Sequence, residues 1–395
     1  MILNGKQIND WDEHDLLVLL DNIDYKESET IDYKLNFAFL EADDKKIIQH
    51  KKDEFRHDIC SFANANGGYM FFGINEDNGV ATSIPGLSLV NSNTDAFECK
   101  LKDIISTIQP VVPFYLLRFF SLNNGNYVVV LRINRGNYKP YVNKENDYFK
   151  YYIRRGNGKV CMNYEEVKVM FNKSMELAYQ IDDFRKKRIR MCTNKEGVAS
   201  SMNSDAFALI HFIPDSAFTY INQINPVMAW MNREINFLQI FSQNAHGQGI
   251  PNIDGLVFNY SIYDKSDKRY LQIFKNGAIE KFITIEKFTP GENSRLGIGS
   301  LCNEIRSLYA EAIRYYKTLG YNSSLYVGLT IMNCKGCCSE LDFERDYIGI
   351  IDRDEIICAP FEISDIYNEE QVENMIKSIL HDLCFSLGRR NVKEI

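Results

Sequence analysis

The sequence predicts an α/β (α+β) protein built from two domains. Its 395 residues exceed the length of one ordinary domain. Segments that alternate polar and apolar residues, as half-buried strands do, are interleaved with segments whose apolar residues recur every three or four positions, as on one face of a helix. Because 45% of the residues are hydrophobic, each domain can bury a core of its own.

The first half places a strand pattern between two helix patterns. An amphipathic helix is predicted over 8–24, and Thr30–Phe37 then alternates polar and apolar residues, which predicts a strand with one wet face. Residues 53–63 place apolar side chains on one helical face, and Gly67-Gly68 ends this helix. The apolar run 69–74 is typical of a strand buried on both faces.

Turn and breaker residues bound the other elements of this half, such as Pro110 after a helix and the hairpin turn Asn123-Asn-Gly125. These elements are a helix over 95–108, strands over 114–122, 126–133 and 148–154, and a long helix that begins at Asn163 and ends in a basic run.

The second half predicts a mixed α/β domain. Small and polar residues over 191–204 are typical of a linker, so the two domains are predicted to span 1–190 and 205–395. The second domain is predicted to contain strands over 206–213, 256–262 and 270–274, a helix over 299–318, strands over 325–332 and near 347–351, and a helix over 367–387.

Composition narrows the setting and the partners. No run of 18 apolar residues is present and the N-terminus lacks a signal-peptide pattern, so we expect a cytoplasmic protein with no membrane partner. The net charge of −8 argues against bulk electrostatic adhesion to nucleic acid, although a local basic patch remains compatible with it. The ten cysteines are scattered and favour free thiols; the Cys334-Lys-Gly-Cys337-Cys338 segment lacks the second ligand pair of a zinc site.

Acidic residues and a lysine gather at the start of the strand predicted over 30–37. Asp32 and Lys34 are two positions apart and therefore share one face. Glu27 can join Asp32 only if it lies in the turn before the strand. A carboxylate that holds a divalent metal beside a lysine that offsets phosphate charge is suited to phosphodiester cleavage. An ordinary ion pair on a solvated strand face explains the same pattern.

A second acidic pair, Glu76 and Asp77, follows the buried strand 69–74. Strand ends are where α/β folds place catalytic groups, whereas a polar turn is the simpler interpretation of these residues. His57, in Phe-Arg-His-Asp, lies between the two acidic segments in the sequence, and we expect it on the helix surface. The glycine patterns of nucleotide-binding loops are missing from the sequence.

Three motifs, in this order, resemble the AlbA_2 domain shared with Schlafen proteins. They are Glu27-Ser-x3-Asp32-Tyr-Lys34, Phe62-Ala-Asn-x2-Gly-Gly-Tyr-x2-Phe-Gly-Ile74 and Tyr151-Tyr-x-Arg154-x-Gly-Asn157. The resemblance covers roughly residues 20–175 and implies a Schlafen-like AlbA_2 domain, followed by the second domain that often accompanies AlbA_2 in bacterial proteins. The Schlafen branch implies a metal-dependent endoribonuclease acting on structured RNA such as tRNA, in a setting of defence or stress response.

The resemblance assigns roles residue by residue. Glu27 and Asp32 fall on the first two acids of the family's centre, and Glu76 falls on the third, with Asp77 as a near alternative. It therefore implies that Glu27, Asp32 and Glu76 hold Mg²⁺ or Mn²⁺, while Lys34 steadies the phosphate. Asp32 stands where the family usually has Glu, and Glu76 where it has Asp, so the reach of each carboxylate differs by one methylene.

Basic residues in two places are candidates for nucleic-acid contact. A glycine turn flanked by arginines can hold phosphates, although an arginine paired with an acid of the next helix is the alternative. A basic helix end can also touch a phosphate backbone, but such cations more often complement the helix dipole. The candidates are Arg154, Arg155 and Asn157 at the turn, and Arg185, Lys186 and Lys187 at the helix end.

Two functions therefore stay open. In the first, the protein is a metal-dependent endoribonuclease whose acids are essential for cleavage. In the second, it is a DNA-binding transcriptional regulator with an inactive AlbA_2 domain, in which the arginines carry binding. We expect RNA or DNA as partner, a homodimer, and a small-molecule or protein trigger that acts on the C-terminal domain.

Overall fold

A computed structural model describes most of the chain and divides it into two compact units, Met1–Glu176 and Leu177–Ile395. The predicted α/β (α+β) class is confirmed, because helices and several sheets occur in both units. The residues described are 1, 3–6, 8–88, 93–145, 148–198, 206–218, 225–245, 248–259, 269–285, 287–288, 294–319, 321, 324–339, 350–366 and 368–386.

The division between the units falls inside one continuous helix, α4 (Tyr164–Thr193). It therefore lies ahead of the linker predicted over 191–204. Ile181 and Ile189 of α4 are already buried in cores of unit 2, which explains why this helix belongs to the second unit well before residue 191. Residues 199–204 of the predicted linker lie outside the described residues.

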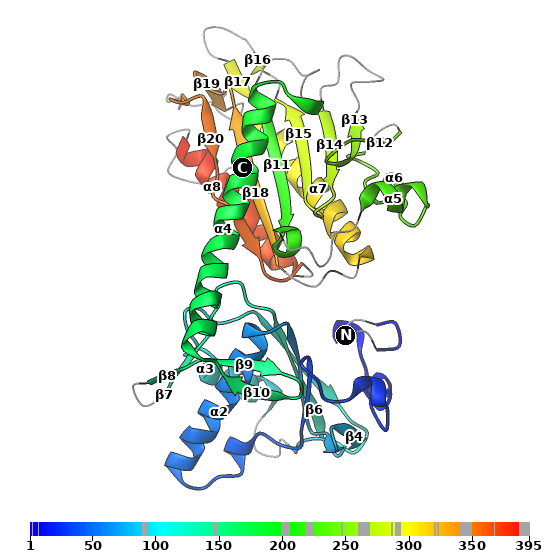
Figure 1. Cartoon of the computed structure of the whole chain (residues 1–395), viewed down its shortest axis with the longest axis vertical. Coiled ribbons are helices and arrows are strands. Elements are labelled where there is room, and N and C mark those ends of the chain that lie inside the picture. Colours follow the sequence, from blue (N-terminus) through cyan, green and yellow to red (C-terminus); the bar gives the residue numbers. More distant parts are fainter. Residues whose placement is uncertain are drawn as a thin grey trace. The chain divides into compact units, whose positions relative to one another are not determined.

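A four-stranded sheet forms the centre of unit 1 (Figure 1). β1 (Ile31–Lys34) runs parallel to β2 (Gly67–Phe72), which pairs antiparallel with β6 (Tyr127–Asn134), and β5 (Tyr115–Ser121) completes the order β1-β2-β6-β5. Both faces are covered, as predicted for the segment 69–74. Met70 and Phe72 pack in one core, while Tyr69 and Phe71 pack in another on the opposite face.

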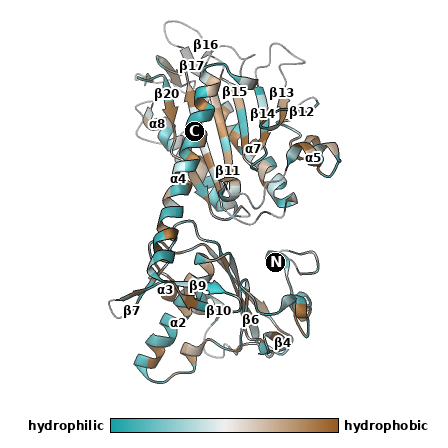
Figure 2. Ribbon diagram, viewed as in Figure 1, coloured by the Kyte–Doolittle hydropathy of each residue, from teal (hydrophilic) through white to brown (hydrophobic). Residues whose placement is uncertain are grey.

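Two helices, α2 (Lys45–Asn64) and α3 (Thr94–Ile105), contribute to the first of these cores. Asp44 caps α2 by accepting hydrogen bonds from the backbone N–H groups of Lys46 and Ile47. Figure 2 shows that the first turns of α2 are largely hydrophilic, whereas its later residues are buried. A short 3₁₀ turn, η3 (Ala38–Leu40), precedes it.

The N-terminal helix predicted over 8–24 is wrong as a single element. The segment instead forms η1 (Ile8–Asp10), α1 (Glu13–Leu17) and η2 (Ile23–Tyr25). Asp12 starts a new helix through a capping box with Asp15, and Asp21 adopts a left-handed backbone (φ 51°) that ends the helical path.

Three hairpins complete unit 1, and the strand predicted over 148–154 is split at Tyr151 between two of them. The hairpins are β3 (Asn75–Asp77) with β4 (Val80–Ser83), β7 (Asn143–Glu145) with β8 (Tyr148–Lys150), and β9 (Tyr152–Arg155) with β10 (Gly158–Cys161).

Unit 2 is built on an eight-stranded antiparallel sheet. Helices α7 (Ile298–Thr318) and α8 (Glu369–Ser386) pack against one face, and the second half of α4 covers the other. The strands are, in spatial order, β12 (Ile250–Pro251), β13 (Gly255–Asn259), β14 (Arg269–Phe274), β15 (Ile279–Thr284), β11 (Phe207–Pro214), β18 (Leu325–Met332) and β20 (Glu355–Ile357), with β21 (Phe361–Ile363) also paired to β18.

The smaller elements of unit 2 lie outside this sheet. They are α5 (Pro226–Met231), α6 (Phe237–Ile240), η5 (Asp215–Phe218), and a three-stranded sheet of β16 (Lys287–Phe288), β17 (Ser294–Leu296) and β19 (Cys337–Ser339). Of the strand predicted near 347–351, residues 347–349 lie outside the described residues and 350–351 are not in a strand. Among the described helices, we find none with the length and apolar character needed to cross a bilayer.

Candidate functional site in unit 1

Glu27 lies in the turn before β1, which is the position that it needs in order to approach Asp32. Its Oε1 accepts a hydrogen bond from the backbone N–H of Tyr33 (2.9 Å), and its own N–H donates to the carbonyl of Gly79 (2.8 Å). Gly79 has a left-handed backbone (φ 81°), and a Cβ there would lie 3.2 Å from the Glu27 Cβ. The β3–β4 turn is therefore seated directly against Glu27.

Asp32 and Lys34 point to the same face of β1, as their spacing predicts. The Lys34 Nζ lies 2.8 Å from Asp32 Oδ2, and the Asp32 side chain is only 8% exposed. Asp32 Oδ1 accepts a hydrogen bond from Arg154 Nη2 at 3.0 Å. Oδ2 is buried without a well-aligned hydrogen bond to any described residue, although Lys34 is adjacent. The lysine is 32% exposed and so remains reachable from solvent.

Arg154 is buried and used inside the domain, which corrects the expectation that it contacts phosphate. Besides Asp32, its guanidinium donates to the carbonyls of Ser28 (3.1 Å) and Ile31 (3.2 Å). Its Cζ lies 4.3 Å from the centre of the Phe62 ring, a cation–π contact. Arg154 therefore fixes the turn before β1 and compensates the buried charge of Asp32.

The second motif supports this contact. A Cβ at Gly68 would lie 2.6 Å from the Phe62 ring and 2.5 Å from the carbonyl of Thr30. Glycine at this position is therefore what allows β2 to approach β1 and the aromatic ring under Arg154.

Three further charged residues, which the sequence analysis missed, extend the site along α2. Asp58 Oδ2 lies 3.7 Å from Lys34 Nζ, and Asp58 Oδ1 lies 2.9 Å from Lys159 Nζ of β10. Lys159 also pairs with Glu54 at 2.9 Å. The i,i+4 spacing of Glu54 and Asp58 places them on one helical face, but no sequence signal shows which strand that face meets.

His57 is buried, at 1% exposure, which corrects the expectation that it lies on the helix surface. It stacks on Tyr152 with ring centres 4.6 Å apart, and neither ring nitrogen forms a hydrogen bond with a described residue. Its Nδ1 lies 3.8 Å from Glu54 and its Nε2 lies 3.9 Å from Glu145 of β7. Burial, together with Lys159, lowers the pKa of His57, against the charges of Glu145 and Glu54.

The electrostatics of the site single out Glu27. Burial raises its pKa, and the neighbouring charges of Asp32 and Glu76 raise it further, against the hydrogen bond from Tyr33 and the charge of Lys34. Burial disfavours the charged form of Lys34, but the carboxylates of Asp58 and Asp32 raise the pKa of this lysine overall. Glu27 is therefore a carboxylate that takes up a proton more readily than usual, beside an ammonium that stays charged.

Glu76 and Asp77 lie on the exposed β3 strand. Glu76 Oε2 accepts a hydrogen bond from the N–H of Gly79, and Asp77 Oδ1 accepts one from the Asn78 side chain. Glu27 and Glu76 both contact Gly79 of this turn, and the charge of Glu76 raises the pKa of Glu27. Glu76 is thus the nearer of the two to the centre, whereas the contacts of Asp77 are those of a polar turn.

The donor set of Glu27, Asp32 and Glu76 matches the oxygen chemistry of Mg²⁺ or Mn²⁺, and Asp32 Oδ2 is a buried oxygen that lies 2.8 Å from the Lys34 ammonium. Their arrangement does not match it. Among the described residues, no three His, Cys, Asp or Glu side chains converge as metal ligands. Asp32 is instead held by Arg154 and Lys34, and each glutamate binds a backbone N–H.

The turn between β9 and β10 carries the other residues of the third motif. Arg155 pairs with Glu166 in the first turn of α4, so it forms the pair with an acid of the next helix that the sequence allowed as an alternative to phosphate contact. The Gly156 N–H donates to Glu29 (3.4 Å). Arg155 and Asn157 are exposed, so they remain accessible to a ligand, whereas Arg154 is not.

The basic helix end separates into buried and exposed residues. Arg185 is 2% exposed and donates to the carbonyls of Leu329 (3.1 Å) and Cys358 (2.9 Å), which corrects its assignment to nucleic-acid contact. Lys186 is exposed and pairs with Asp182 at 2.6 Å, and Lys187 is exposed. Of the three residues predicted to make contact at this helix end, Lys186 and Lys187 therefore remain as candidates.

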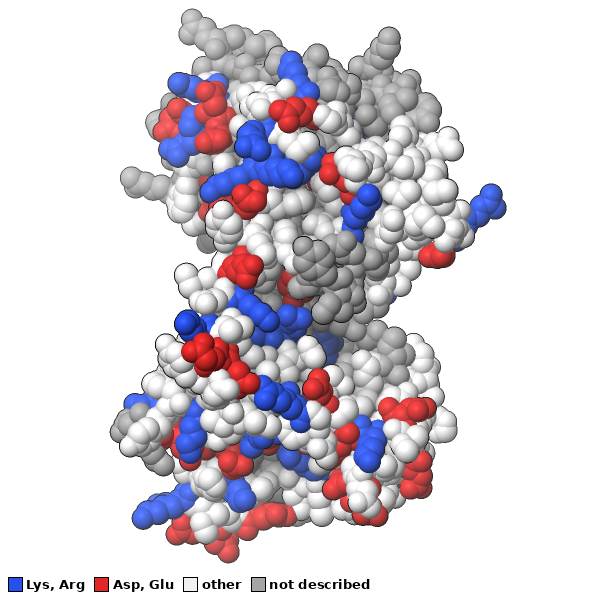
Figure 3. Space-filling model, in the orientation of Figure 1, with Lys and Arg blue, Asp and Glu red and all other residues white. Residues whose placement is uncertain are grey.

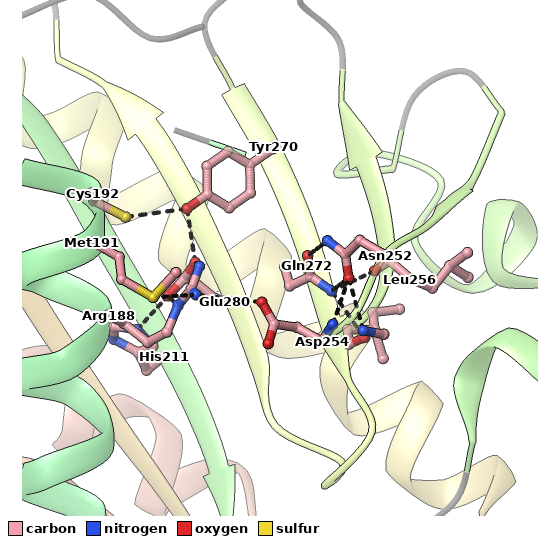
Figure 4. Close-up of polar contacts among 12 residues, drawn as sticks. Arg188, Met191, Cys192, His211, Asn252, Asp254, Leu256, Tyr270, Gln272 and Glu280 are labelled. Atoms are coloured by element: carbon pink, nitrogen blue, oxygen red, sulfur yellow. Dashed lines mark hydrogen bonds and ion pairs between the residues drawn. The ribbon is translucent and has the colours of Figure 1, made fainter. Parts of the chain in front are cut away.

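Arg188, in the same run, enters a buried polar network in unit 2 (Figure 4). Its guanidinium binds both carboxylate oxygens of Glu280 at 2.9 and 2.8 Å. His211 Nε2 and the Tyr270 hydroxyl also contact that carboxylate, at 2.9 and 2.8 Å. Despite its burial, these donors hold the pKa of Glu280 far below its usual range. The network joins α4 to the sheet of unit 2.

Charged side chains of both signs are interspersed on the face seen in Figure 3. Lysines and arginines among the residues drawn in colour do not merge there into one broad basic area. Positive charge on this face is therefore local, in agreement with the net charge of −8.

Unit 1 is thus an α+β unit with an acid–lysine cluster at the start of β1, and part of it matches a known family. Residues 27–163 match the family model described as Schlafen, AlbA_2. The predicted AlbA_2 domain is confirmed for this segment, and the family relates it to nucleic-acid functions.

Two solved structures show weaker likeness. The DIP2311 protein from Corynebacterium diphtheriae is 16% identical over 34% of this chain, with a TM-score of 0.24, and the present chain covers 25% of its length. The N-terminal domain of a RecG-related protein from Nitrosomonas europaea is 18% identical over 36% of this chain and 84% of its own, also with a TM-score of 0.24. Neither likeness is close enough to support an inference about function.

Proposed function

We propose that the AlbA_2 unit cleaves RNA at the cluster of Glu27, Asp32 and Lys34. One observation carries the proposal: the Lys34 ammonium lies 2.8 Å from Asp32 Oδ2 yet is 32% exposed, and burial and the charge of Asp32 raise the pKa of Glu27 in the same cluster. Structured RNA such as tRNA is the substrate class that the family resemblance favours.

The chain's own groups supply an acid–base route. Glu27, with its raised pKa, accepts a proton from the attacking hydroxyl group more readily than an ordinary carboxylate. As the attacking oxygen bonds to phosphorus, the P–O bond to the leaving ribose oxygen breaks, and that oxygen takes a proton from solvent. The Lys34 ammonium stabilises negative charge that develops on the phosphate. Asp32 and Asp58 position this ammonium from two sides. Because the described acids do not converge as metal ligands, no step of this route uses a divalent cation, and Mg²⁺ and Mn²⁺ enter the proposal only as conditions to be tested.

A specific observation favours the second candidate, a DNA-binding regulator with an inactive AlbA_2 domain. Asp32 is charge-compensated by Arg154 and Lys34, and the acids among the described residues do not converge on a common point. In this candidate, the exposed Arg155, Lys186 and Lys187 carry the binding.

The deciding experiment incubates labelled tRNA, single-stranded RNA and duplex DNA with the protein in Mg²⁺, Mn²⁺ or EDTA. Glu27→Gln and Lys34→Gln are compared with Glu29→Gln, an exposed acid in the same segment. We expect the rate of RNA cleavage to fall by at least tenfold in the first two variants and to persist in the third. General acid–base catalysis contributes about 10²-fold or more, and the smaller limit of tenfold allows for residual routes. Duplex-DNA binding without any cleavage would instead support the regulator.

Two other features belong to the proposal. We propose a homodimer and a small-molecule or protein trigger that acts on the C-terminal unit. Light scattering of the full chain tests the first. Cleavage before and after addition of cell extract, fractionated by size, tests the second; activity that is unchanged in every fraction would argue against a trigger.

A further inference from the structure

The β7–β8 hairpin displays two aromatic side chains that contribute to neither core of unit 1 among the described residues. Tyr148 is 72% exposed and Phe149 is 49% exposed. The register pairs Tyr148 with Glu145 and Phe149 with Lys144, so the two rings lie on opposite faces of the hairpin. Rings exposed to this degree are available to a ligand.

The base of this hairpin is firmly held. Asn143 is 2% exposed, and its side-chain amide donates to Asp53 Oδ1 of α2 at 2.8 Å. The same Asp53 oxygen accepts a hydrogen bond from Arg56 at 2.6 Å. Next to Asn143, Val142 exchanges two backbone hydrogen bonds with Gln109, both of 2.9 Å. The rings therefore project from an anchored base, which limits the entropy that a ligand has to remove on binding.

The charges beside the rings suit a polyanion. Lys144 and Lys150 are exposed on the two strands. Two acids lie between them in the sequence: Asp147 is outside the described residues, and Glu145 has a side chain that is only 16% exposed and lies 3.7 Å from Lys150. Glu145 is turned toward α2, where it lies 3.8 Å from His50 and 3.9 Å from His57. Rings flanked by lysines match a polymer of planar bases on a phosphate backbone.

A run of charged groups connects the hairpin to the candidate site within unit 1. It passes from Glu145 to His57 (3.9 Å), from His57 to Glu54 (3.8 Å) and from Glu54 to Lys159 (2.9 Å). It continues from Lys159 to Asp58 (2.9 Å) and from Asp58 to Lys34 (3.7 Å). The hairpin and Lys34 are therefore linked by neighbouring side chains of α2 and β10.

We propose that the β7–β8 hairpin is a binding site for unpaired bases, in which Tyr148 and Phe149 stack on bases and Lys144 and Lys150 contact phosphates. This rests on the proposed function in so far as the ligand is nucleic acid, and it adds that the ligand has a single-stranded segment at this hairpin. Stacking requires an exposed base face, so a regular duplex fits the rings poorly.

The test measures binding of a short fluorescein-labelled single-stranded RNA, and of the same sequence as a duplex, by anisotropy in EDTA. Tyr148→Ala is compared with Tyr164→Ala, a tyrosine of the same unit with a similar exposure of 76%. We expect roughly tenfold weaker single-strand binding for Tyr148→Ala, since one stacked ring contributes about 1–3 kcal/mol and 1.4 kcal/mol is a factor of ten. Tyr164→Ala should bind as the wild type does.

Two further variants sharpen the result. Phe149→Ala should add to the loss, and Lys144→Gln with Lys150→Gln should lower the dependence of log K on log salt by roughly one unit per lost phosphate contact. Equal affinities of the Tyr148 and Tyr164 variants would overturn the proposal, as would an equal loss on duplex RNA. Binding in EDTA is measured without cleavage, so its outcome is separate from that of the cleavage test. If Tyr148→Ala weakens single-strand binding in a protein that never cleaves RNA, the nuclease is refuted and the binding site is retained.

Discussion

Arg154 and Arg155 are neighbours in sequence with opposite environments, and substituting each with glutamine tests the assignment of the site. Arg154 is 3% exposed and binds Asp32 and two backbone carbonyls, whereas the Arg155 side chain is 50% exposed and pairs with Glu166. We expect Arg154→Gln to destabilise unit 1 strongly and Arg155→Gln to leave its stability nearly unchanged.

The magnitude follows from what each substitution leaves behind. Removing one partner of a buried ion pair costs about 3–5 kcal/mol, and because Lys34 still lies 2.8 Å from Asp32 we take the lower end, about 3 kcal/mol. A domain of this length loses about 2–4 °C in Tm per kcal/mol, so Tm should fall by roughly 6–12 °C. The exposed pair of Arg155 contributes about 0–1 kcal/mol, which corresponds to a fall of at most roughly 4 °C.

Tryptophan fluorescence makes the measurement specific for unit 1. The chain has two tryptophans, the buried Trp11 in unit 1 and Trp230 in unit 2. In a Trp230→Phe background, thermal unfolding followed by fluorescence therefore reports on unit 1 alone. A fall in Tm of less than about 2 °C for Arg154→Gln, accompanied by a selective loss of RNA binding, would refute the structural role and restore Arg154 as a phosphate contact.

Three other changes test the rest of the structure. Glu280→Gln should destabilise unit 2 by about 3–5 kcal/mol because it leaves Arg188 and His211 without their buried anion. Unfolding of unit 2 is followed by the fluorescence of Trp230 in a Trp11→Phe background, and a loss of less than about 1 kcal/mol would contradict this. Burial lowers the pKa of His57 and of His211 from 6.5, so below that pH the unfolded chain takes up protons that the folded chain does not. Stability should therefore decrease as the pH falls below 6.5, by at most about 1.4 kcal/mol per histidine per pH unit. Urea midpoints that are equal at neutral and mildly acidic pH would show that these histidines are protonated in the folded state. Gly68→Ala should destabilise unit 1 by about 1–3 kcal/mol through overlap with Thr30 and Phe62, whereas Gly158→Ala, with open space around its Cβ position, should be neutral; similar Tm values would argue against the close approach of β1 and β2.

The sequence predicted the elements whose pattern is local. Alternation over 30–37, the apolar run 69–74 and the three-to-four spacing within 53–63 correspond to β1, β2 and α2, because side-chain periodicity follows directly from backbone geometry. The same reasoning placed Asp32 and Lys34 on one face, and the ordered motifs identified the AlbA_2 domain that the family match confirms.

Local patterns failed where a cap or a long-range contact decides the outcome. The helix predicted over 8–24 is broken because Asp12 caps a new helix that ends at Leu17, and the left-handed backbone of Asp21 turns the chain before η2. Both signals are single residues within an amphipathic pattern. The basic run at the end of α4 was interpreted as a surface, but helix rotation against the sheet buries Arg185 and Arg188 and exposes Lys186 and Lys187.

The amino-acid sequence by itself determined which of the candidate residues share a face of a strand or helix. Only the tertiary structure decided their partners. Arg154 reaches Asp32 across 122 residues, and Lys159 reaches Glu54 across 105, because the β9–β10 hairpin folds over α2 and β1. Charge compensation, burial and pKa depend on such distant neighbours, since electrostatic energy depends on separation in space and not on separation along the chain.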